Sequence, residues 1–237
     1  MPEFSKRSEA NEIMDDLHYA GPLMDRTLRE LEVINRFLGG NAVTLTALDK
    51  ITSSYSRNSQ LCIADLGCGR GDMLRLIHQW AKKRKQRVEL LGVDANEYVV
   101  KAAQQNLKDL PHIKVLAQDI LSDEFKQHRF DLVIGTLFYH HFTNDELVAF
   151  FKTMKRNTRV GFIINDIHRH PAAYYSIKML TACFSKSSMV KFDAPLSVLR
   201  AFSRNELKMI LEESGLQNFE IRWRWAFRWQ VLVYTNL

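Results

Sequence analysis

Three glycines that alternate with other residues, Gly67, Gly69 and Gly71, follow an apolar run that ends in Asp65. A strand, a glycine loop and a helix form a site where backbone N–H groups can approach a ligand closely. The loop lacks the lysine of a phosphate-binding P-loop, and its Gly-x-Gly-x-Gly spacing differs from that of dinucleotide sites. A carboxylate beside the loop would repel pyrophosphate, so the pattern favours a ligand with a cationic ammonium group.

Four of the eight histidines follow two apolar runs that are typical of strands: His140 and His141 after one, His168 and His170 after the next. Because ligands bind at the carboxyl ends of strands in open α/β sheets, we expect these imidazoles at the mouth of the site. A histidine, with an ordinary pKa of about 6.5, can accept the proton of a phenol, whose pKa is about 10. The pattern predicts a general base among His140, His141 and His168, although one ring can equally pack and bond to backbone.

The other polar residues of this region give weaker indications. His168 and His170 have the spacing of half a metal site, but Asp166 is the one evident carboxylate partner, so the sequence predicts no metal. Nearby tyrosines would supply aromatic walls to a pocket, or belong to the core. The predicted acceptor pocket is formed by Tyr139, His170, Tyr174 and Tyr175.

The elements that position these residues alternate between two periods. Strands are predicted at 61–66, 88–94, 113–120, 130–138 and 159–167, and helices at 72–83, 96–110 and 144–156. Strands that alternate with helices predict a parallel sheet wrapped on both faces, hence an α/β doubly wound fold. Residues 216–236 predict an antiparallel hairpin at the sheet edge, with its turn near residues 225–228. The period of two in "RWRWAFRW" favours one buried aromatic face over a surface that stacks bases.

Two segments break this alternation and predict helical covers. Helices expected at 23–38 and 43–56 precede the first strand, so residues 1–58 are predicted to form an N-terminal helical cap. Residues 59–237 are then the ligand-binding domain. An insertion at about 167–202, with a helix at 172–184, follows a strand and is expected to cover the binding crevice.

Composition narrows the function classes. The net charge of +6 would allow a nucleic-acid partner, but the main basic run, 82–87, falls at a predicted helix end, where cations complement the helix dipole. No apolar run approaches the ~20 residues of a membrane helix, and no secretory signal is evident, so a cytoplasmic location without membrane insertion is expected. Three scattered cysteines predict reduced thiols.

The motif "DLGCGRGD" resembles the glycine motif of class I S-adenosylmethionine-dependent methyltransferases of the small-molecule type, and later landmarks follow in order. Asp94 ends the second strand, where the family's acidic residue holds the ribose hydroxyls. Asp119 ends the third, where the family contacts the adenine amino group, or it caps the following turn. "FDLVIGTLFYHHF" resembles the fourth-strand motif. The resemblance covers about 60–165 and 203–236.

The resemblance implies a seven-stranded, mostly parallel Rossmann-like sheet with an antiparallel C-terminal hairpin. It implies S-adenosylmethionine as cofactor and S-adenosylhomocysteine as product, with Cys68 lending its backbone N–H. The implied cofactor contacts are Asp65, Gly67, Cys68, Gly69, Gly71, Asp94, Ala95, Asp119, Ile120 and Gly135.

The class of methyl acceptor is inferred by comparing the motif after the fourth strand with the motifs of other methyltransferases. "GTLFYHH" lacks the Asn/Asp-Pro-Pro-aromatic motif of base-modifying enzymes, and no paired glutamates follow the fourth strand as in protein-arginine enzymes. We therefore expect a small molecule, methylated on an oxygen of a phenolic, quinol or polyketide-like compound. An RNA- or protein-modifying methyltransferase and a non-catalytic cofactor-binding partner subunit stay as alternatives, and the sequence predicts no oligomeric state.

Overall fold

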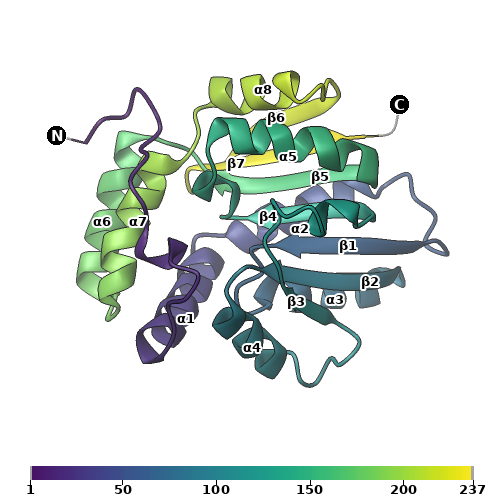
Figure 1. Cartoon of the computed structure of the whole chain (residues 1–237), viewed down its shortest axis with the longest axis horizontal. Helices are drawn as coiled ribbons and strands as arrows, with labels where there is room; N and C mark the ends of the chain where they lie inside the picture. Colours follow the sequence, from purple (N-terminus) through teal and green to yellow (C-terminus); the bar gives the residue numbers. More distant parts are fainter. Residues whose placement is uncertain (1, 236–237) are drawn as a thin grey trace.

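The computed structural model describes residues 2–235, and within them seven strands form a single sheet (Figure 1). The strand order is β3-β2-β1-β4-β5-β7-β6, with β1 to β5 parallel and β7 antiparallel to both of its neighbours. This confirms the predicted doubly wound fold with a C-terminal hairpin. The strands are β1 (Gln60–Leu66), β2 (Arg87–Asp94), β3 (Lys114–Ala117), β4 (Phe130–Thr136), β5 (Thr158–Ile167), β6 (Phe219–Arg224) and β7 (Arg228–Tyr234).

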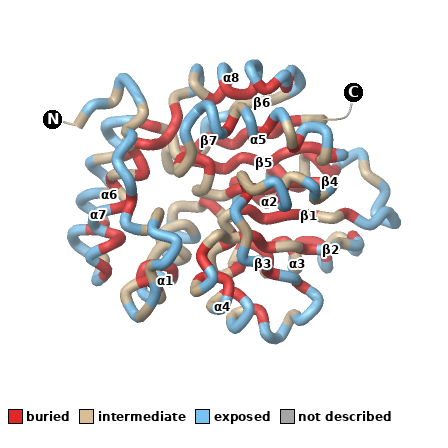
Figure 2. Tube along the Cα trace, in the orientation of Figure 1, coloured by how far each residue is buried: buried red, intermediate tan, exposed pale blue. Residues whose placement is uncertain are grey.

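Both faces of the sheet are covered by helices. On β1, Leu61 and Ile63 belong to one apolar core, whereas Ala64 and Leu66 belong to the core of the opposite face. This is why the strand is an almost unbroken apolar run. Figure 2 shows the buried residues concentrated along β1, β4 and β5. The first core lies beneath α2 (Gly40–Ile51), α3 (Asp72–Arg84) and α4 (Glu97–Asn106), and the second beneath α5 (Asn144–Asn157) and α8 (Arg204–Glu213).

Three further helices stand beyond the carboxyl ends of the strands: α1 (Pro22–Phe37), α6 (Pro171–Phe184) and α7 (Ser188–Arg200). They lie together at the left of Figure 1, where β5 leads directly into α6. The short 3-10 turn η1 (Ile13–Asp15) packs against α7, as do α1 and α6. These elements form a roof over the end of the sheet that binds ligands in this architecture.

Several helices and strands begin or end at residues other than those predicted. The helix predicted at 96–110 ends at Asn106, and the strand predicted at 113–120 covers only Lys114–Ala117. The predicted insertion at about 167–202 contains a second helix, α7, which sequence analysis missed because Pro195 lies inside it. In the predicted N-terminal cap, α2 contacts β5 and β7, so it covers a sheet face, whereas α1 covers the strand ends.

The hairpin forms as predicted, but its expected buried aromatic face is wrong. Trp223 and Trp225 are 47% and 70% exposed, and only Trp229 of the three is buried. Arg228 is buried in their place, with Nη1 donating to Asn165 Oδ1 at 3.3 Å. The reason is that β6 is an edge strand with little to pack against, while β7 is enclosed between β5 and β6.

The N-terminal segment is held on α7 by hydrogen bonds to its backbone. The carboxylate of Asp193 accepts from the N–H groups of Ile13 and Met14 at 2.8 and 3.2 Å. Farther along, the N–H of Ser8 donates to the carbonyl of Leu199 at 2.9 Å. The segment therefore follows α7 across the strand ends, as Figure 1 shows.

None of the helices between residues 2 and 235 combines the length and apolar character that crossing a membrane requires.

We predict that Asp193→Ala releases the N-terminal segment without unfolding the sheet. Two backbone N–H groups lose their acceptor, and each such bond contributes about 1 kcal/mol. Amide hydrogen exchange at Ile13 and Met14 should accelerate about tenfold or more. The control is Asp145→Ala, which removes an exposed carboxylate from the first turn of α5. Unchanged exchange at both amides would contradict the anchoring role.

Candidate active site

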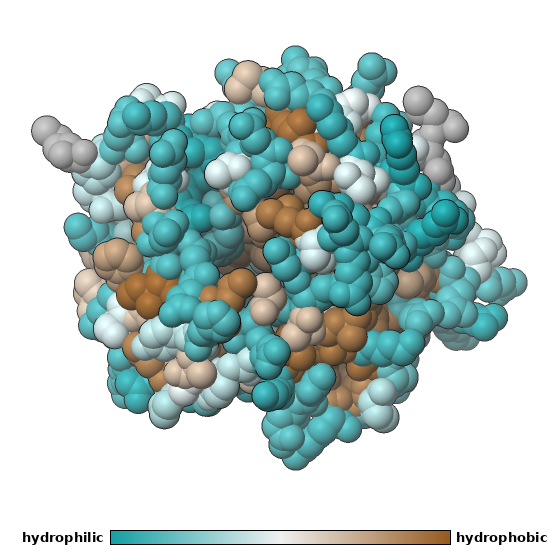
Figure 3. Space-filling view, in the orientation of Figure 1, coloured by the Kyte–Doolittle hydropathy of each residue, from teal (hydrophilic) through white to brown (hydrophobic). Residues whose placement is uncertain are grey.

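A cavity of about 780 Å³ lies between the carboxyl ends of the strands and the roof. Pockets for small molecules are typically about 300–1,000 Å³. Residues of the glycine loop, η1, α1, α6, α7 and the β6–β7 turn line it. Figure 3 shows this face of the molecule hollowed near its centre, with hydrophobic side chains around the hollow. The cavity has an acidic end at the glycine loop and a second polar end at two histidines.

The glycine loop is bare on one side and tightly packed on the other. All three glycines have φ between +52° and +79°, a conformation that side chains rarely adopt. A Cβ at Gly69 would meet no atom closer than 4.0 Å, and Gly69 lines the cavity. A Cβ at Gly67 would lie 2.1 Å from the ring of Phe138, and one at Gly71 would lie 2.6 Å from Leu107. Gly69 thus offers open backbone, whereas the other two permit close packing.

Asp94 is the last residue of β2, and two backbone N–H groups fix the position of its carboxylate. Oδ2 accepts from the N–H of Gly69 at 3.2 Å and Oδ1 from the N–H of Asn96 at 3.1 Å. Burial raises the pKa of Asp94, and these two hydrogen bonds oppose the rise. Each carboxylate oxygen has a second lone-pair site, so the group can also accept from two ligand hydroxyls.

Two residues predicted to bind the cofactor make hydrogen bonds within the chain. The N–H of Cys68 donates to the carbonyl of Val93 at 3.1 Å, so the contact of this N–H with a ligand stays a prediction. The bond ties the loop to the end of β2. Asp119 lines the cavity, and its Oδ1 accepts from the N–H of Leu121 at 2.8 Å, which is the turn-capping alternative.

The loop end of the cavity is acidic. Asp65, Asp72 and Asp94 all line it, and burial raises the pKa of Asp65 to about 8 and that of Asp72 to about 7. Asp72 Oδ1 and Gln118 Oε1 are buried there without a hydrogen-bond partner among the described residues. Clustered carboxylates with unpaired oxygens favour a ligand that brings positive charge and hydrogen-bond donors.

His140 and His141 stand in η3 (Tyr139–His141), the turn that follows β4, and both line the cavity. His140 is buried, with Nδ1 2.7 Å from Asp166 Oδ1 and its N–H donating to Asp166 Oδ2 at 3.2 Å. Opposite charge on His140 keeps the pKa of Asp166 below its usual range despite burial, which alone would raise it. Asp166 therefore sets the orientation of the His140 ring.

His141 has an equivalent carboxylate partner from the N-terminal segment. Its Nδ1 is 2.7 Å from Asp15 Oδ1, and its backbone carbonyl accepts from Arg200 Nη2 at 2.7 Å. Arg200 also bonds to Asp15 through Nη1. Burial would raise the pKa of Asp15, but the bonds from His141 and Arg200 bring it well below its usual range. Residues far apart in the chain thus form one buried polar network.

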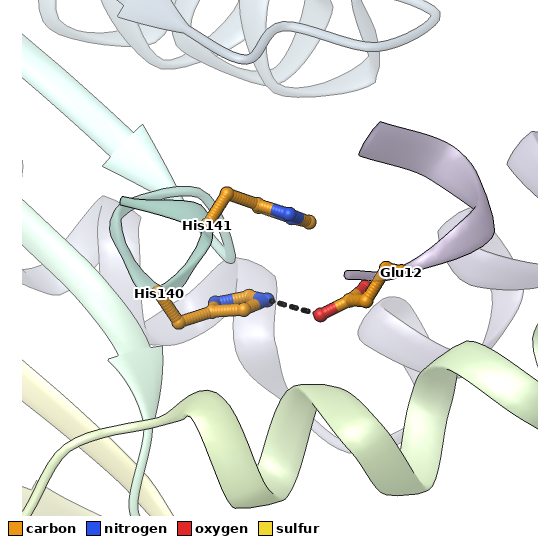
Figure 4. Close-up of side chains that lie close together, drawn as sticks. All are labelled: Glu12, His140 and His141. Atoms are coloured by element: carbon orange, nitrogen blue, oxygen red, sulfur yellow. Dashed lines mark ion pairs between the residues drawn. The ribbon is translucent and has the colours of Figure 1, made fainter. Parts of the chain in front are cut away.

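Glu12 completes this end of the cavity. Its Oε2 accepts from Ser197 Oγ at 2.9 Å, and its Oε1 lies 3.8 Å from His140 Nε2 (Figure 4). Burial raises the pKa of Glu12 to about 7. Figure 4 shows both histidines extending from η3 toward Glu12, which approaches from the opposite side. Sequence analysis missed Glu12, Asp15 and Arg200, because no local pattern marks them.

Several predicted site residues lie elsewhere. His168 packs against Trp229, with ring centroids 4.6 Å apart, and exposed His170 caps α6 by accepting from the N–H of Ala172. Tyr139 is buried in the core against Phe151. The predicted residues outside the cavity lining are Gly71, Gly135, Tyr139, His168, His170, Tyr174 and Tyr175. Of those with side chains, Tyr139 faces the core and His168 the edge hairpin, Tyr174 packs against Phe4, and His170 and Tyr175 are exposed.

Residues 63–161, from β1 into β5, match a family model described as a methyltransferase domain. The match begins at the glycine loop's strand and includes Asp94, Asp119 and both cavity histidines. This segment is a methyltransferase domain, and the chain is an S-adenosylmethionine-dependent methyltransferase.

Curated relatives of this methyltransferase include two carboxy-S-adenosyl-L-methionine synthases of Helicobacter pylori strains HPAG1 and G27. They are 26% and 27% identical over 178 residues, which cover 71% of this chain and 73% of each relative.

Solved structures show the same fold at low sequence identity. The plantazolicin methyltransferase BamL matches with a TM-score of 0.63 at 14% identity, over 85% of this chain and 71% of that one. The magnesium protoporphyrin IX methyltransferase of Synechocystis PCC 6803 matches with a TM-score of 0.55 at 16% identity, over 85% and 87%. The citrinin polyketide synthase CMeT domain matches with a TM-score of 0.60 at 14% identity, over 79% of this chain. This chain spans half of that last structure.

S-adenosylmethionine is the cofactor of this methyltransferase, and the acidic end of the cavity fits it. The open backbone at Gly69 leaves room for a ligand, and Asp94 can accept from a pair of ribose hydroxyls. The surrounding carboxylates suit a ligand with a sulfonium and an ammonium group.

We predict that Asp94→Ala weakens S-adenosylmethionine binding about 100-fold. Two hydrogen bonds to a charged acceptor are lost, at about 1.5 kcal/mol or more each. Calorimetric titration measures the change, and the melting temperature checks that the loop survives. The control is Asp109→Ala, an exposed carboxylate paired with Arg75. Equal affinity in wild type and Asp94→Ala would exclude Asp94 as a ribose ligand.

We also predict that affinity for S-adenosylmethionine rises with pH between about pH 6 and 7.5, below the ordinary pKa of its amino group. With a pKa of about 8, Asp65 is mostly protonated in this range, and a cationic ligand favours loss of that proton. The dissociation constant should fall by up to about tenfold per pH unit. Asp72 adds to the same trend, so Asp65→Asn should reduce the slope. A flat or opposite dependence in wild type would contradict this electrostatic role.

Proposed function

We propose that this enzyme methylates an oxygen of a small phenolic, quinol or polyketide-like acceptor held beneath the helical roof. The observation that carries the proposal is the single cavity, which joins the acidic cofactor end to two carboxylate-bonded histidines. Its remaining wall is largely apolar and comes from α1 and α6. Apolar lining residues include Leu31, Ile34, Phe138, Ile177 and Leu180.

Within the cavity we assign the acidic end to the cofactor. Asp94 accepts from the ribose hydroxyls, and Asp119 and Ile120 border the adenine. Asp65 and Gly69 border the cationic part. These positions agree with the family motif and with the lining, and they leave the histidine end for the acceptor.

When bound, S-adenosylmethionine supplies a methyl group that is already activated by a positively charged sulfur. The protein therefore needs to align the acceptor and favour loss of its proton. The Nδ1 atoms of His140 and His141 bond to Asp166 and Asp15, which leaves Nε2 as the free ring atom of each. We assign both histidines to the acceptor hydroxyl. His168 is not proposed, because it lies outside the cavity lining.

A small-molecule acceptor also agrees with the roof and with the similar structures. η1, α1, α6 and α7 cover the strand ends, which leaves a cavity rather than an open basic groove for a macromolecule. The similar structures include a polyketide synthase methyltransferase domain and a plantazolicin methyltransferase. Buried Arg228 adds a positive charge to the lining that suits an acceptor with an anionic oxygen.

We predict that the enzyme methylates members of a panel of phenols and quinols and that His141→Ala lowers kcat about 100-fold. His140→Gln should have a similar effect, whereas affinity for S-adenosylmethionine stays unchanged in both. Mass spectrometry of the acceptor measures the product. The matched control is His168→Ala, which we expect to stay within about threefold of wild type.

Two results would overturn the proposal. One is full activity in His141→Ala and His140→Gln together with loss of activity in His168→Ala. The other is no methylated acceptor but a mass gain on S-adenosylmethionine itself, the reaction for which the Helicobacter relatives are named.

A further inference from the structure

We propose that Glu12, His140 and His141 bind one divalent metal ion of the Zn²⁺ class in the wall of the cavity. A ring nitrogen of each histidine and a carboxylate oxygen of Glu12 lie within 4.8 Å of one another. Two histidines and a glutamate are a ligand set of catalytic zinc sites, which keep a further coordination position open. The three residues line the cavity, so that position is accessible to a ligand in the cavity.

The first independent observation is the bonding of the histidines. Metal-ligating histidines almost always donate their other ring N–H to a carboxylate or carbonyl, which fixes the tautomer. Here both rings have that partner, since Asp166 Oδ1 and Asp15 Oδ1 are each 2.7 Å from an Nδ1 atom. A general base requires only one histidine that is bonded to a carboxylate. Here two neighbouring histidines are each bonded to a carboxylate through Nδ1, which leaves both Nε2 atoms available to a metal ion.

The second observation is a buried carboxylate oxygen of Glu12 that has no hydrogen-bond partner within residues 2–235. Glu12 Oε1 is buried and has no hydrogen-bond partner among the described residues, although its side chain is only 3% exposed. It lies 3.8 Å from His140 Nε2 and 3.9 Å from Arg200 Nε. The other oxygen of Glu12 is held by Ser197, so the free oxygen is fixed in direction. An unpaired carboxylate oxygen is costly to bury unless a cation binds it.

The charges around the two rings are mixed, with carboxylates in the majority. Four carboxylates, of Glu12, Asp15, Asp166 and Asp193, face the guanidiniums of Arg200, Arg7 and Arg228. Arg200 is already bonded to Asp15 and to the carbonyl of His141. Its Nε also lies 3.9 Å from Glu12 Oε1 but donates no hydrogen bond to it, so this oxygen keeps its lone pairs for an ion.

Small movements of side chains complete the site. Ligand atoms about 2.1 Å from a tetrahedral ion are roughly 3.4 Å apart, against 3.8 Å between His140 Nε2 and Glu12 Oε1 here. Figure 4 shows the two rings directed toward Glu12 across this space. The role of the ion rests on the proposed function and replaces the direct contact of the histidines with the acceptor. With both Nε2 atoms on the ion, an acceptor hydroxyl at the open position would lose its proton to water more readily, as zinc-bound water does.

The test is a titration of the untagged, chelator-treated full chain with Zn²⁺, without cofactor or acceptor. We expect one equivalent to bind and to raise the melting temperature. Glu12→Gln and His141→Gln should each weaken binding at least about 100-fold, and Asp166→Asn about 10- to 100-fold. His141 is partly exposed, so its variant keeps the test valid if Glu12→Gln fails to fold.

The matched control is the double variant His78→Gln/His112→Gln. That exposed pair, with ring nitrogens 3.2 Å apart, is another place where histidines of the described chain could capture zinc. We expect its binding to equal that of wild type. The proposal is overturned if wild type binds less than one equivalent, if Glu12→Gln and His141→Gln bind equally well, or if the control loses the ion.

The experiment separates this inference from the proposed function. Methylation of a phenol by protein that binds no zinc would leave the function standing and remove the metal site. Zinc bound at Glu12 with no acceptor methylated would retain the site and remove the function.

Discussion

The hydrogen bond between buried Asp166 and His140 is the interaction on which the site depends. It joins the end of β5 to the turn after β4, two adjacent parallel strands whose side chains alone would not fix that turn. The carboxylate holds both the backbone and the ring of His140, so η3 has one orientation. His141, next in the chain, is thereby directed to the same cavity. A buried carboxylate is stable here because its partners are charged or donate hydrogen bonds.

The second half of the site comes from the N-terminal segment, and it is positioned by bonds to α7. Asp193 holds η1, and Arg200 joins Asp15 to the carbonyl of His141. Glu12 and Ser197 pair across the same junction. The roof and the sheet are thus connected through these polar contacts and through apolar packing of α1 and α7 against Val99 of α4. The histidine end of the cavity therefore forms only when the N-terminal segment and α7 are in place against the sheet.

Sequence analysis predicted the elements and site residues that a short stretch of sequence is enough to mark. The alternation of strands and helices, the glycine loop and Asp94 all follow from short-range patterns, and the fold is confirmed. Glu12 and Asp15 could not be found in this way, because Asp15 meets His141 across 126 residues. Histidines at a strand end were a sound expectation, but His168 turns toward Trp229 on the edge hairpin. Helix α7 was missed because Pro195 suppresses its pattern.

The packing of Phe138 over Gly67 has a consequence for how the two ends of the cavity communicate. The ring stands where any side chain at Gly67 would be, and it immediately precedes η3. Any displacement of the glycine loop would therefore press directly on the segment that carries the histidines. The two ends of the cavity are thus joined by a contact between one aromatic ring and one missing methyl group.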